Sequence, residues 1–171
     1  MNNWIYKVFL LTFLLSIIFT GVTNVIAYNT NQIILLILII VSIILANIFD
    51  MISTSALTSK EATFHAMNSQ KVKGAKEAIW LVKNNVQVVS VCSDVIGDIL
   101  GITSGGLGAV LALNLADATG FNITITLIIV MALISAFTVS TKALSKEIAV
   151  KKSDQIIFKI GKIVRIFKKQ K

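Results

Sequence analysis

Three long stretches of this chain contain no charged residue, and they constrain its fold more than any other feature. They cover residues 8–27, 33–49 and 121–141. Each is long enough, as an α-helix, to cross a hydrocarbon core of about 30 Å. A helix on the surface of a soluble protein would show charged residues at helical spacing, and these stretches show none. We therefore expect an all-α integral membrane protein, in agreement with a mean hydropathy of +0.85.

A fourth transmembrane span is predicted at about residues 86–113, where the sequence is less apolar and rich in Gly and Ser. The expected fold is all-α, with about four transmembrane helices and amphipathic helices on the membrane surface. The predicted regions are two N-terminal transmembrane helices at 1–50, a cytoplasmic amphipathic segment at 51–85, two further transmembrane helices at 86–144 and a basic amphipathic C-terminal helix at 145–171. The first apolar stretch ends in VIAYNT, which also fits a signal-peptidase site. Its length favours an uncleaved span, and removal as a signal peptide is the alternative.

The basic residues predict the orientation of the chain in the membrane. The formal net charge is +8, and most Lys and Arg residues lie at 60–83 and 142–171, whereas the turns at 28–32 and 114–122 have none. Because Lys and Arg concentrate in cytoplasmic loops, we expect a multi-pass protein of the cell membrane with both termini in the cytoplasm. Cations placed beside membrane spans, without clustered aromatic residues, also argue against a nucleic-acid partner.

The C-terminal segment has the pattern of a basic amphipathic helix. Apolar residues from Ile156 to Phe167 recur on one helical face, and Lys159, Lys162 and Arg165 fall on another. A helix of this kind rests on an anionic leaflet, with its apolar face in the lipid and its cations near the headgroups. Anionic lipid is therefore an expected partner of this helix.

The sequence offers no catalytic constellation. The single cysteine, Cys92, lies in an apolar stretch, so neither a disulfide framework nor a cysteine-based zinc site can form. A P-loop, a dinucleotide-binding loop and an adjacent pair of nucleophile and base are also missing. We therefore do not expect an enzyme.

Two aspartates stand at the start of the third predicted span, in the stretch SDVIGDILGITSGGLG. Asp94 and Asp98 are four residues apart, so they share one face of a helix. A carboxylate in hydrocarbon costs about 2.5–3.5 kcal/mol on insertion scales. The pair is tolerated if one acid is protonated, if a cation lies between them, or if their face meets water. The glycines that follow at three- and four-residue steps would let another helix approach closely, which suits a homodimer.

A second polar cluster, DMISTS, lies at the end of the second span and contributes Asp50, Ser53 and Ser55. Oxygen ligands without sulfur or histidine suit a hard cation such as Mg²⁺, Na⁺ or Ca²⁺. We therefore predict a cation site formed by five residues, Asp50, Ser53, Ser55, Asp94 and Asp98. The alternatives are that Asp94 is simply hydrated near the interface, and that the glycines serve packing alone.

The order of these segments resembles the transmembrane domain of the CNNM/CorC/CorB family over roughly residues 46–168. STSALTS (53–59) is similar to the family motif S-A-x-E-T-A-L, and VKGAKEAIWLVKN (72–84) is similar to the amphipathic helix that follows it. VIGDI (95–99) resembles an L-I-G-N-like element, with Asp98 in the place of Asn. FTVSTKALSKEIAVKK (137–152) occupies the position of a G-E-I-x-P-K-like motif, with its lysine matched. The first span would be an addition to the family pattern.

The resemblance implies export of Mg²⁺ coupled to Na⁺, binding of the ion through hydroxyl, carbonyl and carboxylate oxygens, and pairing of two copies. Three positions depart from the family motifs, since Thr54 and Thr138 replace glutamates and Thr141 replaces a proline. The CBS-pair and C-terminal domains of full-length members have no counterpart in these residues, so we expect no nucleotide-gated regulation within this chain. The function expected is binding or transport of Mg²⁺ or a related divalent cation. The alternative is a non-transporting scaffold that keeps the fold with a degenerate ion site.

Overall fold

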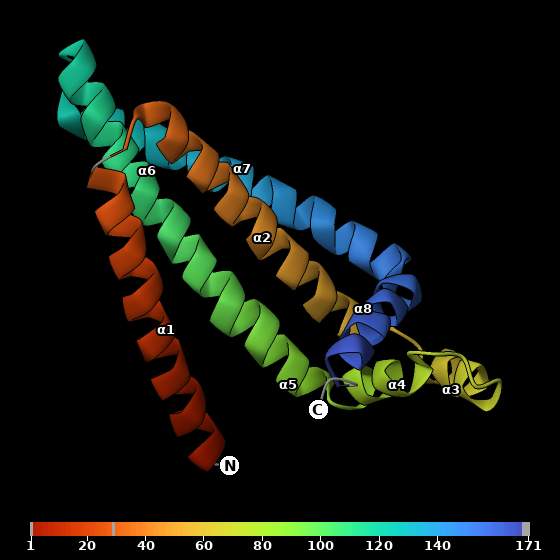
Figure 1. Cartoon of the computed structure of the whole chain (residues 1–171). Helices are drawn as coiled ribbons and strands as arrows, with labels where there is room; N and C mark the ends of the chain where they lie inside the picture. Colours follow the sequence, from red (N-terminus) through yellow and green to blue (C-terminus); the bar gives the residue numbers. More distant parts are fainter. Residues whose placement is uncertain (1, 29, 169–171) are drawn as a thin grey trace. The chain divides into compact units, whose positions relative to one another are not determined.

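The computed structural model describes residues 2–28 and 30–168, and all of its regular structure is helical (Figure 1). The elements are α1 (Asn2–Tyr28), α2 (Gln32–Thr58), α3 (Glu61–Ser69), α4 (Ala75–Lys83), α5 (Asn85–Val89), the π-helix η1 (Ser90–Gly97), α6 (Asp98–Thr119), α7 (Ile123–Lys151) and α8 (Ser153–Lys168). Four helical stretches are long and apolar enough to cross a membrane, namely Ile5–Ala27, Gln32–Thr58, Asn85–Thr119 and Ile123–Lys151. The prediction of an all-α membrane protein with four spans is thereby confirmed.

The chain forms two compact units. Unit 1 consists of Met1–Ala46 and Val95–Thr141, and unit 2 consists of Asn47–Asp94 and Lys142–Lys171. Three helical stretches, α2, the η1 helix and α7, therefore begin in one unit and end in the other.

Unit 1 is held by apolar packing between its long helices. Its core consists of Ala27, Leu35, Ile39, Ile43, Leu107 and Leu111, which come from α1, α2 and α6. A Cβ at Gly108 would lie 2.4 Å from the Cδ1 atom of Ile134, so a larger residue there would require the Ile134 side chain of α7 to move. At Gly101 nothing lies within 4 Å of the added carbon. One of these glycines therefore lies against a side chain of α7, while another faces open space.

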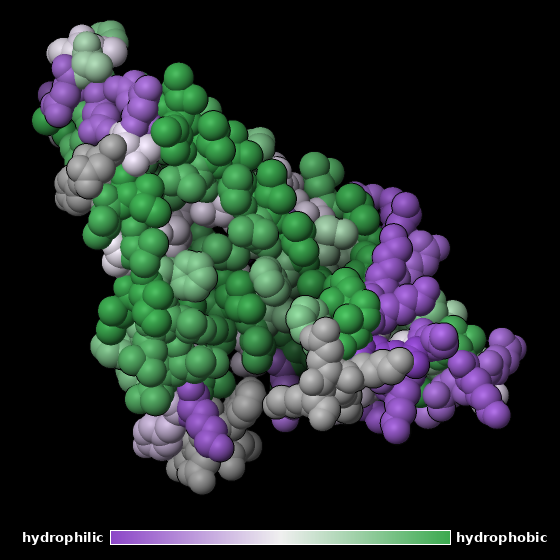
Figure 2. All heavy atoms as spheres, in the orientation of Figure 1, coloured by the Kyte–Doolittle hydropathy of each residue, from purple (hydrophilic) through white to green (hydrophobic). Residues whose placement is uncertain are grey.

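Most of the outer surface of unit 1 is apolar. No residue of the most apolar 18-residue stretch of α1 or of α7 is buried, whereas half of that stretch is buried in Asn85–Thr119. Side chains such as Ile128, Leu133 and Phe137 are more than half exposed on α7. Figure 2 shows hydrophobic residues over the visible faces of α1 and α2. Such surfaces are stable in lipid and would associate in water, so the protein is an integral membrane protein.

Unit 2 has a compact core of its own. Phe64 of α3, Leu81 of α4 and Ile157 of α8 are buried together, because α3 packs on α4 and α4 packs on α8. A Cβ at Gly161 would lie 2.6 Å from the carbonyl oxygen of Gly74, so α8 meets the start of α4 backbone to backbone. Gly74 has φ 95°, a left-handed conformation that favours glycine.

Two hydrogen bonds that the carboxylate of Asp154 accepts connect α8 to the start of α3. The carboxylate of Asp154 accepts the backbone N–H of Lys60 at 2.9 Å and the hydroxyl of Thr63 at 3.0 Å. Asp154 also stands in the first turn of α8, where a negative charge is favourable next to unpaired N–H groups. The same side chain therefore stabilises a helix start and a contact between distant segments.

Two helices extend beyond the regions predicted for them. α2 continues through residues 51–58, and α7 continues through 145–151, where the C-terminal helix was expected to begin. The reason is that no Gly or Pro occurs between residues 123 and 151, so nothing in the local sequence ends the helix at the membrane surface. Residues 1, 29 and 169–171 of the predicted regions lie outside the described residues.

Candidate functional site

A group of polar side chains is buried at the end of α2. Asn47, Asp50 and Ser53 follow one another at three-residue steps, which places them on one face of the helix. Their exposed fractions are 8%, 3% and 4%, and they lie in the second half of α2, an otherwise strongly apolar helix. Ser55 is also buried, and its hydroxyl donates a hydrogen bond to the carbonyl oxygen of Ala149 at 3.4 Å. Ser55 is five positions after Asp50 and so points to another side of α2. We call Asn47, Asp50 and Ser53, together with Ser93, the α2 polar patch.

The carboxylate of Asp50 has two described partners within unit 2. The hydroxyl of Ser93 donates to its Oδ1 atom at 2.6 Å, a short hydrogen bond of the kind that ionised acceptors make. The Nζ atom of Lys146 lies 4.0 Å from its Oδ2 atom. The lysine side chain is 57% exposed and that of the aspartate 4%, so a buried acid is approached by a largely exposed cation. One side of the carboxylate is therefore fixed, and the other has only a distant partner.

Asn47 adds an oxygen atom that lacks a partner. Its Oδ1 atom is buried and accepts no hydrogen bond from any described residue. An unpaired buried acceptor costs about 1–3 kcal/mol. A carboxylate, an amide oxygen and a hydroxyl on one face of a helix are oxygen ligands of the kind that Mg²⁺, Na⁺ and Ca²⁺ prefer. The α2 polar patch therefore has the donor chemistry of a hard-cation site.

The helix that carries Ser93 has an unusual backbone. Residues Ser90–Gly97 form a π-helix between α5 and α6. Such segments are rare and occur frequently at functional sites, because the wider turn changes where side chains point. The Ser93 hydroxyl that reaches Asp50 comes from this segment.

The five predicted ligands are placed differently. Ser53 and Ser55 are buried on α2 with Asp50, whereas Asp94 and Asp98 are exposed. Asp50 and Asp94 belong to unit 2, and Asp98 belongs to unit 1. Among the described residues no group of three or more His, Cys, Asp or Glu side chains could hold a metal ion. The patch accordingly contains one carboxylate and several neutral oxygens.

Sequence reasoning did not identify Asn47 or Lys146 as neighbours of Asp50. A signal for Asn47 was present, since an amide three residues before an acid in an apolar run shares its helical face. For Lys146 the sequence carries no such signal, because it lies ninety-six positions after Asp50 (146 minus 50) and reaches it through tertiary packing.

A second charged cluster lies on α3 and α4, outside the predicted spans. Oε1 of Glu61 lies 2.8 Å from Nε2 of His65 and 3.4 Å from Nζ of Lys83. The hydrogen bond from His65, followed by the interactions with Lys83, lowers the pKa of Glu61 below its ordinary value of 4.5. All three side chains are well exposed, so the cluster connects α3 to α4 at the surface and offers no enclosed site.

The fold and the patch define an all-α, multi-pass integral membrane protein with buried polar oxygens at the end of one span. Comparison with protein-family models, with curated proteins and with solved structures finds no match for this chain. The resemblance to the CNNM/CorC/CorB family therefore stays a prediction.

Proposed function

We propose that this protein binds Mg²⁺, or a related hard divalent cation, at the α2 polar patch and moves it across the membrane. Two observations support the proposal best: the carboxylate of Asp50 is buried, and the Oδ1 atom of Asn47, one turn earlier on the same helical face, is buried without a partner. A bound cation would neutralise the first and satisfy the second. The same function is implied by the resemblance to the CNNM/CorC/CorB transmembrane domain.

The composition of the patch suits a partly hydrated ion. Mg²⁺ gives up water reluctantly and is commonly held by one or two carboxylates, with waters completing its octahedron. Asp50 would supply the charge, and Asn47 and Ser53 would supply neutral oxygens from the same helical face. Ser93 would keep the carboxylate oriented through its hydrogen bond. Na⁺ as a coupling ion would use the same class of ligands.

Lys146 would act as a tethered cation in the ion-free protein. A buried carboxylate needs a positive partner, and the nearest described one is the ammonium of Lys146 at 4.0 Å. Because this lysine is mostly exposed, moving it back into water costs little. An entering Mg²⁺ would therefore displace Lys146 from Asp50, so that the site is neutralised both before and after binding.

Asp98 supports a pair of chains rather than a ligand role within one chain. It is exposed on the isolated chain, within a stretch long and apolar enough to span a membrane. Placing a carboxylate in contact with lipid is unfavourable in free energy. This face of the helix should therefore contact either a second copy of the chain or a water-filled path. A homodimer with both termini in the cytoplasm, as the lysine-rich segments predict, would meet this need.

A non-transporting scaffold is the second candidate. The approach of Lys146 to Asp50 favours it, since the same contact would neutralise the acid permanently in a structural role. The two candidates differ in the effect of Lys146→Met. For a transporter this variant keeps or raises Mg²⁺ affinity, because a competing cation is gone. For a scaffold it leaves a buried charge unpaired, and it lowers stability without any response to Mg²⁺.

The proposal is tested by titrating Mg²⁺ into the purified full chain while following its unfolding temperature and heat of binding. We expect saturable stabilisation of the wild type and a loss of affinity of about 100-fold or more in Asp50→Asn. Asp117→Asn is the matched control, because it removes the same charge from an exposed position on α6. If the wild type shows no saturable response, or if both variants respond alike, binding at the patch is refuted.

A further inference from the structure

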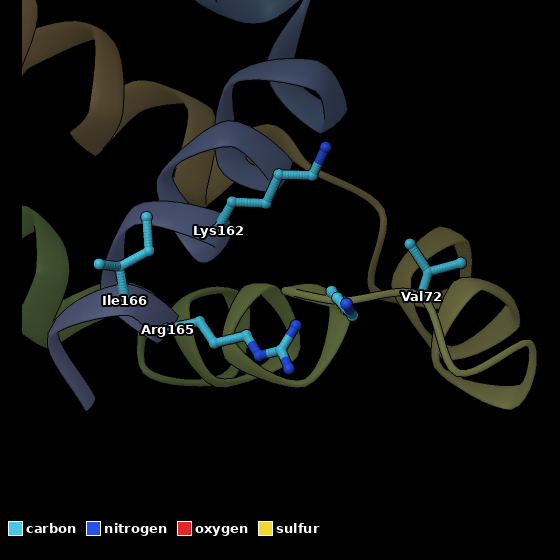
Figure 3. A pocket seen from close by; sticks show the side chains of 5 residues that line it. Val72, Lys162, Arg165 and Ile166 are labelled. Carbon is cyan, nitrogen blue, oxygen red and sulfur yellow. The ribbon is translucent and has the colours of Figure 1, made fainter. Parts of the chain in front are cut away.

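A basic hollow lies between α8 and the start of α4 in unit 2. It has a volume of about 550 Å³ and is lined by Val72, Lys73, Lys162, Arg165 and Ile166 (Figure 3). Three of these five residues carry a positive charge and none carries a negative one. A second hollow of about 280 Å³ shares Val72, Lys73 and Arg165 with it, and adds Lys71 and Lys76 as well as the acid Glu77. Positive charge therefore dominates the whole depression.

Packing fixes the wall of the basic hollow. The Cγ atom of Lys162 would lie only 2.8 Å from a Cβ at Gly74, so its stem is pressed against the loop before α4. Its ammonium stands 4.3 Å from the centre of the Phe158 ring. In Figure 3 this ammonium points away from Arg165, whose guanidinium extends over α4. Because the ammonium of Lys162 lies over Phe158, Arg165 and Lys73 are the two lining cations that we expect to contact a ligand. Lys162 adds to the positive electrostatic potential around them.

Apolar side chains continue the wall of the basic hollow along α8. Ile166 lines it, and Ile163, Ile166 and Phe167 are 48%, 62% and 71% exposed. Only part of the apolar face predicted for this helix is used in the protein core, since Ile157 is buried against α4. The remaining part lies beside the cations. A ligand that fills this surface must therefore combine an anionic group with a hydrocarbon portion.

We propose that the basic hollow is a binding site for a single anionic phospholipid, with its phosphate on Arg165 and Lys73 and its acyl chains over Ile166 and Phe167. The planar fork of arginine suits phosphate oxygens, and lysine supplies a further point charge. The apolar continuation favours a lipid over a free phosphate, which would leave those side chains uncovered. This site is more specific than general contact with an anionic leaflet, because α8 and the loop before α4 form it together. It is independent of cation binding at the α2 polar patch.

The site is tested by native mass spectrometry of the full chain in detergent, titrated with phosphatidylglycerol and with phosphatidylcholine. We expect one phosphatidylglycerol retained per chain in preference to phosphatidylcholine. The double variant Lys73→Gln/Arg165→Gln should weaken retention by about 30-fold, given the usual contribution of two cations at an anionic headgroup. The matched control Lys152→Gln/Lys159→Gln removes the same charge from exposed positions outside the basic hollow and should retain the lipid as the wild type does.

Three results would overturn the proposal. Equal retention of the two lipids by the wild type would show that charge is not recognised. Equal losses in the double variant and its control would show that only net charge matters. Displacement of the lipid by an equal concentration of inorganic phosphate, of glycerophosphoglycerol or of an acidic peptide would assign the hollow to a ligand without acyl chains. If the double variant does not fold, the preference of the wild type for phosphatidylglycerol over phosphatidylcholine still tests the proposal.

Discussion

Units 1 and 2 of this molecule are stabilised by different forces, although three helices run through both. Unit 1 has a small apolar core and presents large side chains such as Leu133 and Phe137 to its surroundings. Unit 2 buries Phe64 completely, and hydrogen bonds accepted by Asp154 and Asp50 connect its segments. Unit 1 therefore depends on lipid to cover its surface, whereas unit 2 is stabilised by its own buried core. The polar residues available for function lie mainly where internal packing can position them.

The largest effect on the free energy of unfolding should come from truncating an aromatic side chain in the core of unit 2. Phe64 is fully buried, so Phe64→Ala should lower the free energy of unfolding by about 3–5 kcal/mol. Phe137→Ala in unit 1 removes a ring that is 53% exposed and should change it by no more than about 0.5 kcal/mol in detergent. Denaturant unfolding followed by circular dichroism measures both. Similar losses in the two variants would remove the distinction between the units.

A smaller loss is expected where α4 and α8 touch. Gly161→Ala forces a carbon to within 2.6 Å of a carbonyl oxygen and should cost about 3 kcal/mol. The comparison in unit 1 is Gly101→Ala, which meets nothing within 4 Å and should stabilise its helix by about 0.5–1 kcal/mol. The same unfolding measurement applies. An unchanged stability of Gly161→Ala would mean that the two helices do not pack as described.

Ser93→Ala tests the hydrogen bond to Asp50. Removing a donor from a buried carboxylate should cost about 1.5 kcal/mol. It should also weaken Mg²⁺ binding, because the acid loses its fixed orientation. Ser140→Ala on the exposed part of α7 is the control and should have no effect on either quantity. A Ser93→Ala protein that binds Mg²⁺ as the wild type does would show that the orienting role is absent.

The smallest effect is a pH dependence from the surface cluster of unit 2. Because the pKa of Glu61 is lowered in the folded protein, its ionised form stabilises α3 and α4 above the ordinary pKa of 4.5. This contribution is lost as the pH falls through the lowered value. The unfolding temperature of the wild type, followed from about pH 6 down to about pH 3, should therefore approach that of Glu61→Gln. A constant difference between the two proteins over this range would contradict the assignment.

Much of the fold was predictable because a helix that crosses lipid needs a long, uncharged, apolar stretch of sequence. Uncharged stretches such as 33–49 identify spans directly, and the periodicity of residues 153–168 identifies α8. Helix ends were less predictable. Nothing in the local sequence ends α7 at the membrane surface, so it continues to Lys151.

The candidate site was predictable only in part. The spacing of Asp94 and Asp98 shows that they share a face, but not which way that face points, and both are exposed. Asp50 was identified as an acid in an apolar setting. Its partner Ser93 is forty-three residues away, on a π-helix that hydrophobic periodicity does not predict. Contacts of this kind depend on tertiary packing, which a pattern of apolar residues does not specify.

The proposed role of the buried Asp50 carboxylate is to carry a divalent cation across the membrane. Its most direct test is Mg²⁺ flux from loaded proteoliposomes that contain the wild type, Asp50→Asn or Asp117→Asn at equal density. We expect flux with the wild type and with Asp117→Asn, and flux at the level of empty liposomes with Asp50→Asn. Wild-type liposomes that leak no faster than empty ones, or an Asp50→Asn protein that transports as the wild type does, would contradict it.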